Sequence, residues 1–221
     1  MAIAFSGSGG VTGTSFSFDI GTANTNRLIT VIAGDESTGT NLLNVTVNSE
    51  RCNLVEIADN PAGLGNHQEL WYIDETGLSG SEGSVTVAIV GGDAGWAVHA
   101  MLHTGVDQNG PVSSGSNNTV VGGTTIDVTG IDCSENGLVV AGYGNGNGGF
   151  TQSGITSPLV LRQNGPDPSS ADLFSNSGVE SSAQTNKTYT QTLSATITTR
   201  ATGIVATWDE FKKKQVFQMI I

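Results

Sequence analysis

The sequence has few charged residues and much glycine. Charged side chains make up 13% of the 221 residues, whereas about 25% is usual in a soluble domain. Glycine occurs 31 times, roughly twice the usual share of about 7%. No stretch carries an apolar stripe over three helical turns, so we expect no long helix. The composition suits short strands that are joined by many turns.

Basic residues are also few. The chain holds eight Lys and Arg against twenty Asp and Glu, which gives a formal net charge of −12. Three of the bases are Lys212, Lys213 and Lys214, so residues 1–208 carry a formal charge of −13. A protein that binds nucleic acid or anionic lipid needs a basic face. We therefore expect neither nucleic acid nor a membrane among its partners.

Cysteine is scarce as well. Cys52 and Cys133 are the only two, and no C-x-x-C pair occurs, which argues against a thiolate zinc site. Cys52 lies on the same side of a predicted strand as Leu54 and is expected to be a small buried hydrophobic residue. A single disulfide and two free thiols both remain open from the sequence alone.

Long hydrophobic runs are absent. No apolar run reaches about 18 residues, so we expect no transmembrane helix. Residues 1–13, MAIAFSGSGGVTG, lack the basic and apolar regions of a signal peptide. We therefore expect a protein that is made in the cytoplasm and stays there, leaves by another route, or leaves as part of a particle.

The fold prediction starts from residues 84–108. This stretch contains two apolar runs joined by a GGDAG turn, and we predict a hairpin that is central in its sheet and covered on both faces. About twelve strands at a spacing of roughly 8–12 residues predict an all-β protein. We expect a two-sheet antiparallel β-sandwich, jelly-roll-like, with a C-terminal extension. No internal repeat is evident, which favours one sandwich domain at 1–210 and an arm or final strand at 211–221.

Metal binding has two kinds of candidate. His99 and His103 share a face of their strand, but four residues along a strand span ~13 Å. One zinc ion cannot bridge that gap with bonds of about 2.0–2.1 Å, so both are interpreted as polar groups on the less buried face. Acidic residues at strand ends fit Ca²⁺ better, although solvated loop carboxylates are the preferred interpretation and no cofactor is predicted. They are Asp35, Glu36, Asp59, Asp74, Glu75, Asp93 and Asp107.

Catalysis has little support in the sequence. No G-x-S-x-G motif occurs, and GNGNGG at residues 144–149 lacks the G-K-[ST] ending of a phosphate loop. We therefore predict that the protein is not an enzyme, with an acidic hydrolase as a remote alternative. Exposed aromatic residues could stack on sugars, although core packing is the default for them. The candidates are Trp71, Tyr72, Trp96, Tyr143, Tyr189 and Trp208.

The C-terminal sequence EFKKKQVFQMII is distinct from the rest. An apolar end of this kind is costly in water unless it is packed. It could form a final strand of the same sandwich, or it could dock on a neighbouring chain while the lysines pair with an acidic surface there. The predicted partner-binding residues are Lys212, Lys213, Lys214, Val216, Phe217, Met219 and Ile220.

Several short motifs carry a resemblance to a known family. They are Asn26-Arg27-Leu28, Glu69-Leu70-Trp71-Tyr72, and residues 104–108 with Pro111 close behind. Over about residues 10–208 the chain resembles a family of jelly-roll-like β-sandwich domains found in phage structural proteins and large bacterial surface proteins. The resemblance implies display or adhesion and supplies no catalytic residues. The family pattern commonly ends with a strand near Trp208, so residues 211–221 depart from it and are expected to be an attachment device.

The resemblance and the missing signal peptide favour one function over another. The first hypothesis is a phage virion structural protein, either a capsid decoration protein or a tail protein, displayed on the particle surface and involved in host attachment. Its partners would be other virion proteins and itself, as a homo-oligomer. The alternative is a carbohydrate-binding or adhesion module that recognises cell-surface glycans, and one protein can do both.

Overall fold

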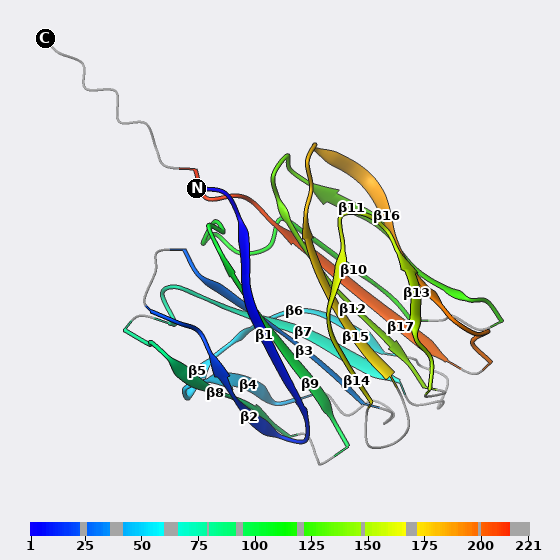
Figure 1. Ribbon diagram of the computed structural model, residues 1–221, viewed down its shortest axis with the longest axis horizontal. Coiled ribbons are helices and arrows are strands. Elements are labelled where there is room, and N and C mark those ends of the chain that lie inside the picture. The colour runs from blue at the N-terminus through cyan, green and yellow to red at the C-terminus, as the bar shows by residue number, and fades with distance from the viewer. Residues whose placement is uncertain are drawn as a thin grey trace, which may run out of the picture.

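The computed structural model describes residues 1–22, 26–35, 42–59, 66–78, 80–91, 95–118, 122–146, 149–166, 172–198 and 200–212. Within these ranges every regular element is a β-strand (Figure 1). All the strand pairs formed by these residues are antiparallel. The predicted class, an all-β antiparallel sandwich, is confirmed.

The first half of the chain forms two sheets. The five-stranded one, inner sheet 1, has the order β1 (Ala4–Thr12), β9 (Ala97–Thr104), β3 (Leu28–Asp35), β7 (His67–Asp74) and β6 (Asn53–Asp59). The four-stranded one, outer sheet 1, has the order β2 (Ser15–Asp19), β8 (Ser84–Val90), β4 (Asn44–Val47) and β5 (Glu50–Arg51). Apolar residues from both sheets form one core between them, among them Val31, Val45 and Val87.

The second half repeats this arrangement. Inner sheet 2 has the order β10 (Ser113–Asn117), β17 (Ala201–Trp208), β12 (Leu138–Asn145), β15 (Asp172–Val179) and β14 (Val160–Pro166). Outer sheet 2 has the order β11 (Thr125–Cys133), β16 (Gln184–Leu193) and β13 (Gln152–Ile155). A second core lies between these sheets and includes Val128, Tyr143 and Tyr189.

Each half has jelly-roll topology. If the main strands of a half are numbered along the chain, the two sheets of the first half read 1-8-3-6 and 2-7-4-5, which is the order of a jelly roll. The second half has the same order in its inner sheet, 1-8-3-6, and reads 2-7-4 in its outer sheet, because its fifth strand, β14, pairs with β15 in the inner sheet. In the first half the fifth strand is split, because β5 pairs in outer sheet 1 and the chain then continues as β6 in inner sheet 1. The sequence predicted one pair of sheets, whereas the described residues form two jelly rolls.

The two jelly rolls pack through their inner sheets (Figure 1). A third core of residues from both halves fills this contact, which we call the seam, and it includes Leu28, Leu70, Leu138 and Trp208. The central strands β3 and β12 are therefore buried along their whole length. This explains why their sequences are apolar on both sides, since each has one neighbour sheet above and another below.

The contacts across the seam are reciprocal, as they are across a two-fold axis. Leu28 and Leu138 occupy the same place, since each opens the central strand after an Asn with positive φ, 65° at Asn26 and 62° at Asn136. Four positions further on, Ile32 and Gly142 touch each other across the seam. The sequence alone did not reveal this repeat.

Other seam contacts occur in matched pairs. Gln68 pairs with Gly34 within inner sheet 1 and contacts Gly144 across the seam. In the other direction, Leu173 pairs with Gly144 within inner sheet 2 and contacts Gly34 across the seam. At the two edges of the seam, Ser8 accepts a hydrogen bond from Gln163 at 2.9 Å, and its equivalent Ser114 donates one to Glu56 at 2.8 Å. The equivalent residues differ in type, which is why the repeat is hard to see in the sequence.

Two strand predictions need correction. Residues 84–108 do not form a hairpin, because β8 pairs with β2 and β4 in outer sheet 1 while β9 pairs with β1 and β3 in inner sheet 1. The turn between the runs crosses from one sheet to the other. The edge strands β1 and β10 were not predicted, because AFSGSGGVT and SSGSN are rich in residues that favour turns and loops.

We predict that Gly142→Val destabilises the protein by about 1–3 kcal/mol, the usual cost of overpacking a core. A Cβ at Gly142 would lie 2.8 Å from Ile32 Cγ2 and 3.0 Å from Ile204 Cγ2. Gly123→Val is the control, because a Cβ there would meet nothing nearer than a backbone nitrogen at 3.9 Å. Urea unfolding measures both variants, and equal stability for the two would contradict close packing at the seam.

Candidate functional site

The two histidines of β9 lie in the seam. His99 is 3% exposed and His103 is 1% exposed. His99 Nδ1 lies 2.8 Å from Ser175 Oγ, and His103 Nε2 lies 3.0 Å from Ser177 Oγ, both on β15 of the other jelly roll. The expectation that these histidines lie on the less buried face is wrong, because the second jelly roll covers the face they share.

Burial keeps both imidazoles neutral. Desolvation lowers the pKa of His99 to about 4. It lowers the pKa of His103 to about 3, with a further contribution from the charge of Arg162. The Arg162 guanidinium lies over the Phe5 ring at 4.0 Å and donates from Nε to Ser177 Oγ at 3.0 Å. His99 also lines a cavity of about 180 Å³ with Gln163 and Asn164. The contacts of both histidines with serines of β15 join the two halves.

We predict that acid weakens the fold through these histidines. Each has a folded pKa below the ordinary value of 6.5, so the unfolded chain binds protons first as the pH falls. Their contribution is fully present above pH 6.5 and is lost as the pH falls to the folded pKa, which is about 4 for His99 and about 3 for His103. The loss is up to ~1.4 kcal/mol per pH unit for each histidine.

Urea unfolding at a series of pH values measures this loss. The double variant His99→Gln, His103→Gln should be less stable at pH 7 and should show a flatter pH dependence between pH 6.5 and 4. A dependence as steep as that of the unsubstituted protein would assign the acid effect to other groups.

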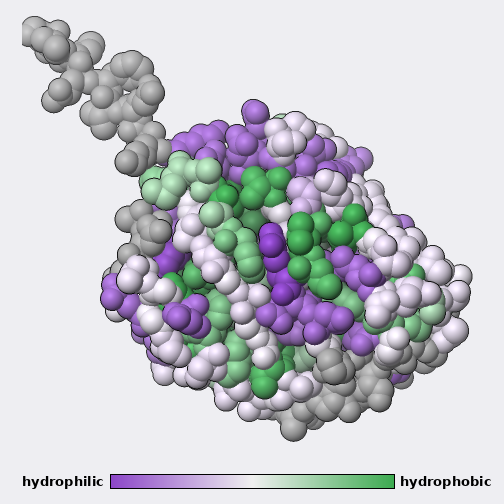
Figure 2. Space-filling view, viewed as in Figure 1, coloured by the Kyte–Doolittle hydropathy of each residue, from purple (hydrophilic) through white to green (hydrophobic). Residues whose placement is uncertain are grey.

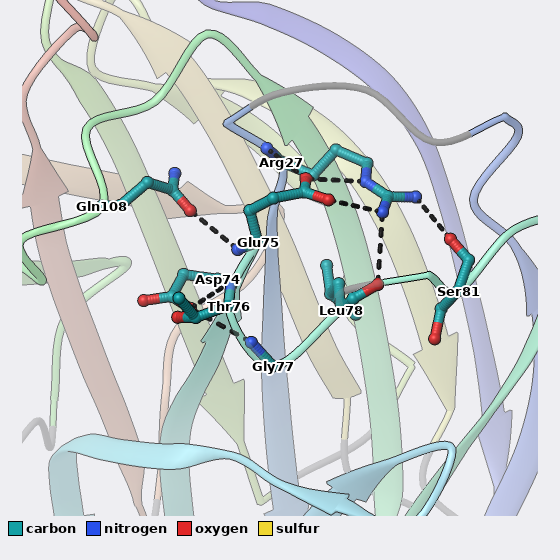
Figure 3. Close-up of polar contacts among 8 residues, drawn as sticks. All are labelled: Arg27, Asp74, Glu75, Thr76, Gly77, Leu78, Ser81 and Gln108. Carbon is teal, nitrogen blue, oxygen red and sulfur yellow. Dashed lines mark hydrogen bonds and ion pairs between the residues drawn. The ribbon is translucent and has the colours of Figure 1, made fainter.

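A buried arginine lies just before β3, next to Leu28, which pairs with His103. Arg27 is fully buried and forms a two-pronged contact with Glu75, from Nε at 2.9 Å and from Nη2 at 2.7 Å (Figure 3). Nη1 donates to the Ser81 carbonyl at 2.8 Å. The hydrogen bond with Glu75 raises the pKa of Arg27. The Glu75 amide donates to Gln108 Oε1 at 2.7 Å, so the network also ties down the linker between the jelly rolls.

We predict that Glu75→Gln costs about 3 kcal/mol of stability, because it leaves the buried Arg27 charge without its counter-ion. The exposed Glu50 is the control, and Glu50→Gln should change stability by less than about 0.5 kcal/mol. Chemical denaturation at pH 7 compares the two. Similar values for both variants would mean that the pair contributes little.

A buried carboxylate also lies in β7. Glu69 accepts hydrogen bonds from the Leu42 amide at 2.7 Å, from His67 Nε2 at 2.9 Å and from Trp71 Nε1 at 2.7 Å. Both His67 and Glu69 are fully buried. His67, Glu69 and Trp71 are each two positions apart, which places them on one side of the strand. This spacing could have revealed the cluster from the sequence, but the sequence analysis did not identify it. With its oxygens held by three donors, Glu69 anchors the start of β4.

The acidic loop residues do not gather into a metal site among the residues that the structure describes. No group of three or more His, Cys, Asp or Glu side chains lies close enough there to hold an ion. Asp74 accepts a hydrogen bond from the Thr76 amide, and Asp107 accepts one from the Asn109 amide, so both stabilise turns. Glu36 and Asp93 lie outside the described residues.

The cysteines and aromatic residues pack in the interior. Cys52 and Cys133 are buried free thiols, one in each jelly roll, so the disulfide alternative is excluded. Of the six sugar-stacking candidates, Tyr72 is partly buried and the others are buried. Tyr72 and Trp208 meet edge to face across the seam, with ring centroids 6.0 Å apart. Default core packing is therefore confirmed for these rings.

One surface groove has both apolar and polar residues in its lining. It lies where the chain leaves β5 for β6, and its cavity volume is about 520 Å³. Its rim includes Leu43 and Leu54, which are 72% and 45% exposed. We call it the Leu54 groove, and its lining residues are Leu42, Leu43, Arg51, Cys52, Asn53, Leu54 and Trp71.

The end of the described chain lies beside its start. The Met1 amino group donates to the Phe211 carbonyl at 3.1 Å and lies 3.7 Å from Glu210 Oε1. The Phe211 amide donates to the Gly105 carbonyl at 2.8 Å. Lys212 is exposed. The other predicted partner-binding residues lie outside the described residues, namely Lys213, Lys214, Val216, Phe217, Met219 and Ile220.

Comparison with known proteins adds no assignment. No family model, no curated protein and no solved structure matches the chain. In the described part of the chain no helix is long and apolar enough to cross a membrane.

Proposed function

We propose that the protein is a phage virion structural protein, either a capsid decoration protein or a tail protein. The observation that carries the proposal is the pair of jelly rolls joined through the seam, because jelly rolls are a common architecture of viral capsid proteins. The sequence resemblance to phage structural domains supports the same reading. A catalytic role is disfavoured, because His99, His103 and Glu69 are buried and hydrogen-bonded to other residues of the chain.

The C-terminal segment is the proposed attachment device. It leaves the body at Lys212, beside Met1 and the strand ends of both jelly rolls. Its three lysines stand against a body with a formal charge of −13 over residues 1–208, so they favour contact with another copy or with a similarly acidic neighbour. Its apolar residues would provide the buried part of such a contact.

Truncation after Phe211 tests the proposal. The full-length protein should be an oligomer that is incorporated into virions, and the truncated protein should be a monomer that is not incorporated. Light scattering measures the mass, and circular dichroism checks that the sandwich stays folded. If the truncated protein has the same mass and enters particles as well as the full-length protein, the arm is not the attachment device.

A second candidate function is binding of a cell-surface glycan. A polar pocket of about 450 Å³ favours it, and its lining includes Ser6, Asp19, Thr22 and Thr104. Such groups can hydrogen-bond sugar hydroxyls, but the buried aromatic residues are not available for stacking. Binding to a glycan on an array that is lost in Asp19→Ala would support this function. If the protein binds no glycan on the array, recognition of those glycans is excluded.

A further inference from the structure

The cavity beside His99 lies at one rim of the seam, where the edge strands of the two inner sheets meet. β1 and β14 are these edge strands, and they lie side by side (Figure 1). We call the space the His99 cavity, and its volume is about 180 Å³. Its lining includes the buried Ala97 and His99 of β9 and the exposed Thr12 of β1 and Asn164 of β14. On the same face of the molecule, Figure 2 shows a hydrophilic patch between hydrophobic ones.

His99 has one ring nitrogen that the protein leaves without a partner. Nδ1 lies 2.8 Å from Ser175 Oγ, whereas Nε2 has no hydrogen-bond partner among the described residues. Two glycines make room beside the ring, because a Cβ at Gly165 would lie 2.9 Å from Nε2 and a Cβ at Gly10 would lie 2.7 Å from Cδ2. A polar atom in the interior needs a hydrogen bond. The partner of Nε2 therefore has to enter from the cavity.

The opposite rim of the seam shows that packing alone does not require this arrangement. In the repeat, His99 corresponds to Ile204 on β17, and Gly165 corresponds to Ala58 on β6. Ile204 and Ala58 are both fully buried and belong to the third core. The same place in the fold thus holds apolar side chains at one rim, and an imidazole beside a cavity at the other.

The lining of the His99 cavity suits an uncharged ligand with several hydroxyl groups. The residues that the structure describes in the lining include no Asp, Glu, Lys or Arg. Burial lowers the pKa of His99 to about 4, so the imidazole is neutral as well and a charged ligand would meet no counter-charge. The polar groups of the lining include the amides of Gln163 and Asn164 and the hydroxyl of Thr12. Amides and hydroxyls both donate and accept hydrogen bonds, and so do ligand hydroxyls.

We propose that the His99 cavity binds one uncharged sugar residue. Its volume equals that of roughly six water molecules at about 30 Å³ each, which suits a single sugar ring better than a drug-sized ligand. Ring hydroxyls bond to His99 Nε2 and to the Asn164 amide, while C–H groups of the ring lie against Ala97 and Val11. The exposed residues of the lining leave the rest of a glycan chain in solvent. This site differs from the polar pocket that includes Asp19, and it does not depend on the proposed virion role.

The experiment follows the histidine ring signals of the full-length protein by NMR while uncharged sugars are added. The chain has three histidines, and the His99→Gln variant assigns the signal of His99. Glucose, galactose, mannose and N-acetylglucosamine are the probes. We expect at least one of them to shift the His99 signal saturably, while the signals of His67 and His103 stay in place because neither residue lines the cavity.

Two substitutions change the cavity in different ways. Gly165→Ala puts a methyl group beside His99 Nε2 and should weaken sugar binding at least tenfold. Its control is Gly123→Ala, which should change binding less than twofold, because a Cβ at Gly123 would meet nothing nearer than 3.9 Å. Asn164→Ala removes an exposed amide without filling the cavity and should weaken binding at least threefold. The urea unfolding midpoint checks that each variant is folded, and Asn164→Ala decides if Gly165→Ala does not fold.

The outcomes separate this site from the other proposals. The proposal is overturned if none of the four sugars shifts the His99 signal, or if binding is undiminished in the folded variants. Binding that is lost in Asp19→Ala and kept in Gly165→Ala belongs to the other pocket and also overturns it. If a glycan array gives the same variant pattern, the ligand is the end of a glycan chain, and a response to the free sugar alone identifies a soluble sugar. Truncation of the arm tests the virion role separately, so either proposal can fail while the other stands.

Discussion

The burial of two five-stranded sheets against each other is the constraint on which the rest of the structure depends. Each inner sheet must be apolar on both faces, because one face supports its own jelly roll and the other faces the seam. This requirement places Leu28 and Leu138 at the same position of two central strands. It also leaves room for Gly142 alone opposite Ile32, where a larger residue would push the halves apart. The jelly rolls are thus two parts of one packed body.

The polar groups within this body are there to connect its parts. His99 and His103 reach the serines of β15, Arg27 holds Glu75 and through it the linker residue Gln108, and Glu69 anchors the start of β4. Such buried groups are stable only when they are paired or hydrogen-bonded. The arrangement leaves the surface and the C-terminal segment to make contact with partners, which is the basis of the proposed structural role.

The sequence predicted the class and the covered strands well, and the physical reasons are clear. Residues such as those of β3 and β17 are apolar on both sides, and that pattern appears only in strands with a layer above and below. The edge strands β1 and β10 escaped notice because Ser and Gly carry no strand pattern. The repeat escaped because equivalent residues differ: His103 corresponds to Trp208, and Gln68 to Leu173. The Arg27–Glu75 pair joins residues 48 positions apart, which no local pattern can reveal.

Amide hydrogen exchange in the native state tests most directly whether the seam makes one body of the two jelly rolls. We expect the amides of β3 and β12 to share the highest protection, because both strands are buried by the same contact and open only when the whole protein unfolds. If the amides of β12 exchange through an opening that leaves β3 protected, or the reverse, the two jelly rolls are stable separately. The seam would then be a weak contact between two independent domains, which contradicts a single packed body.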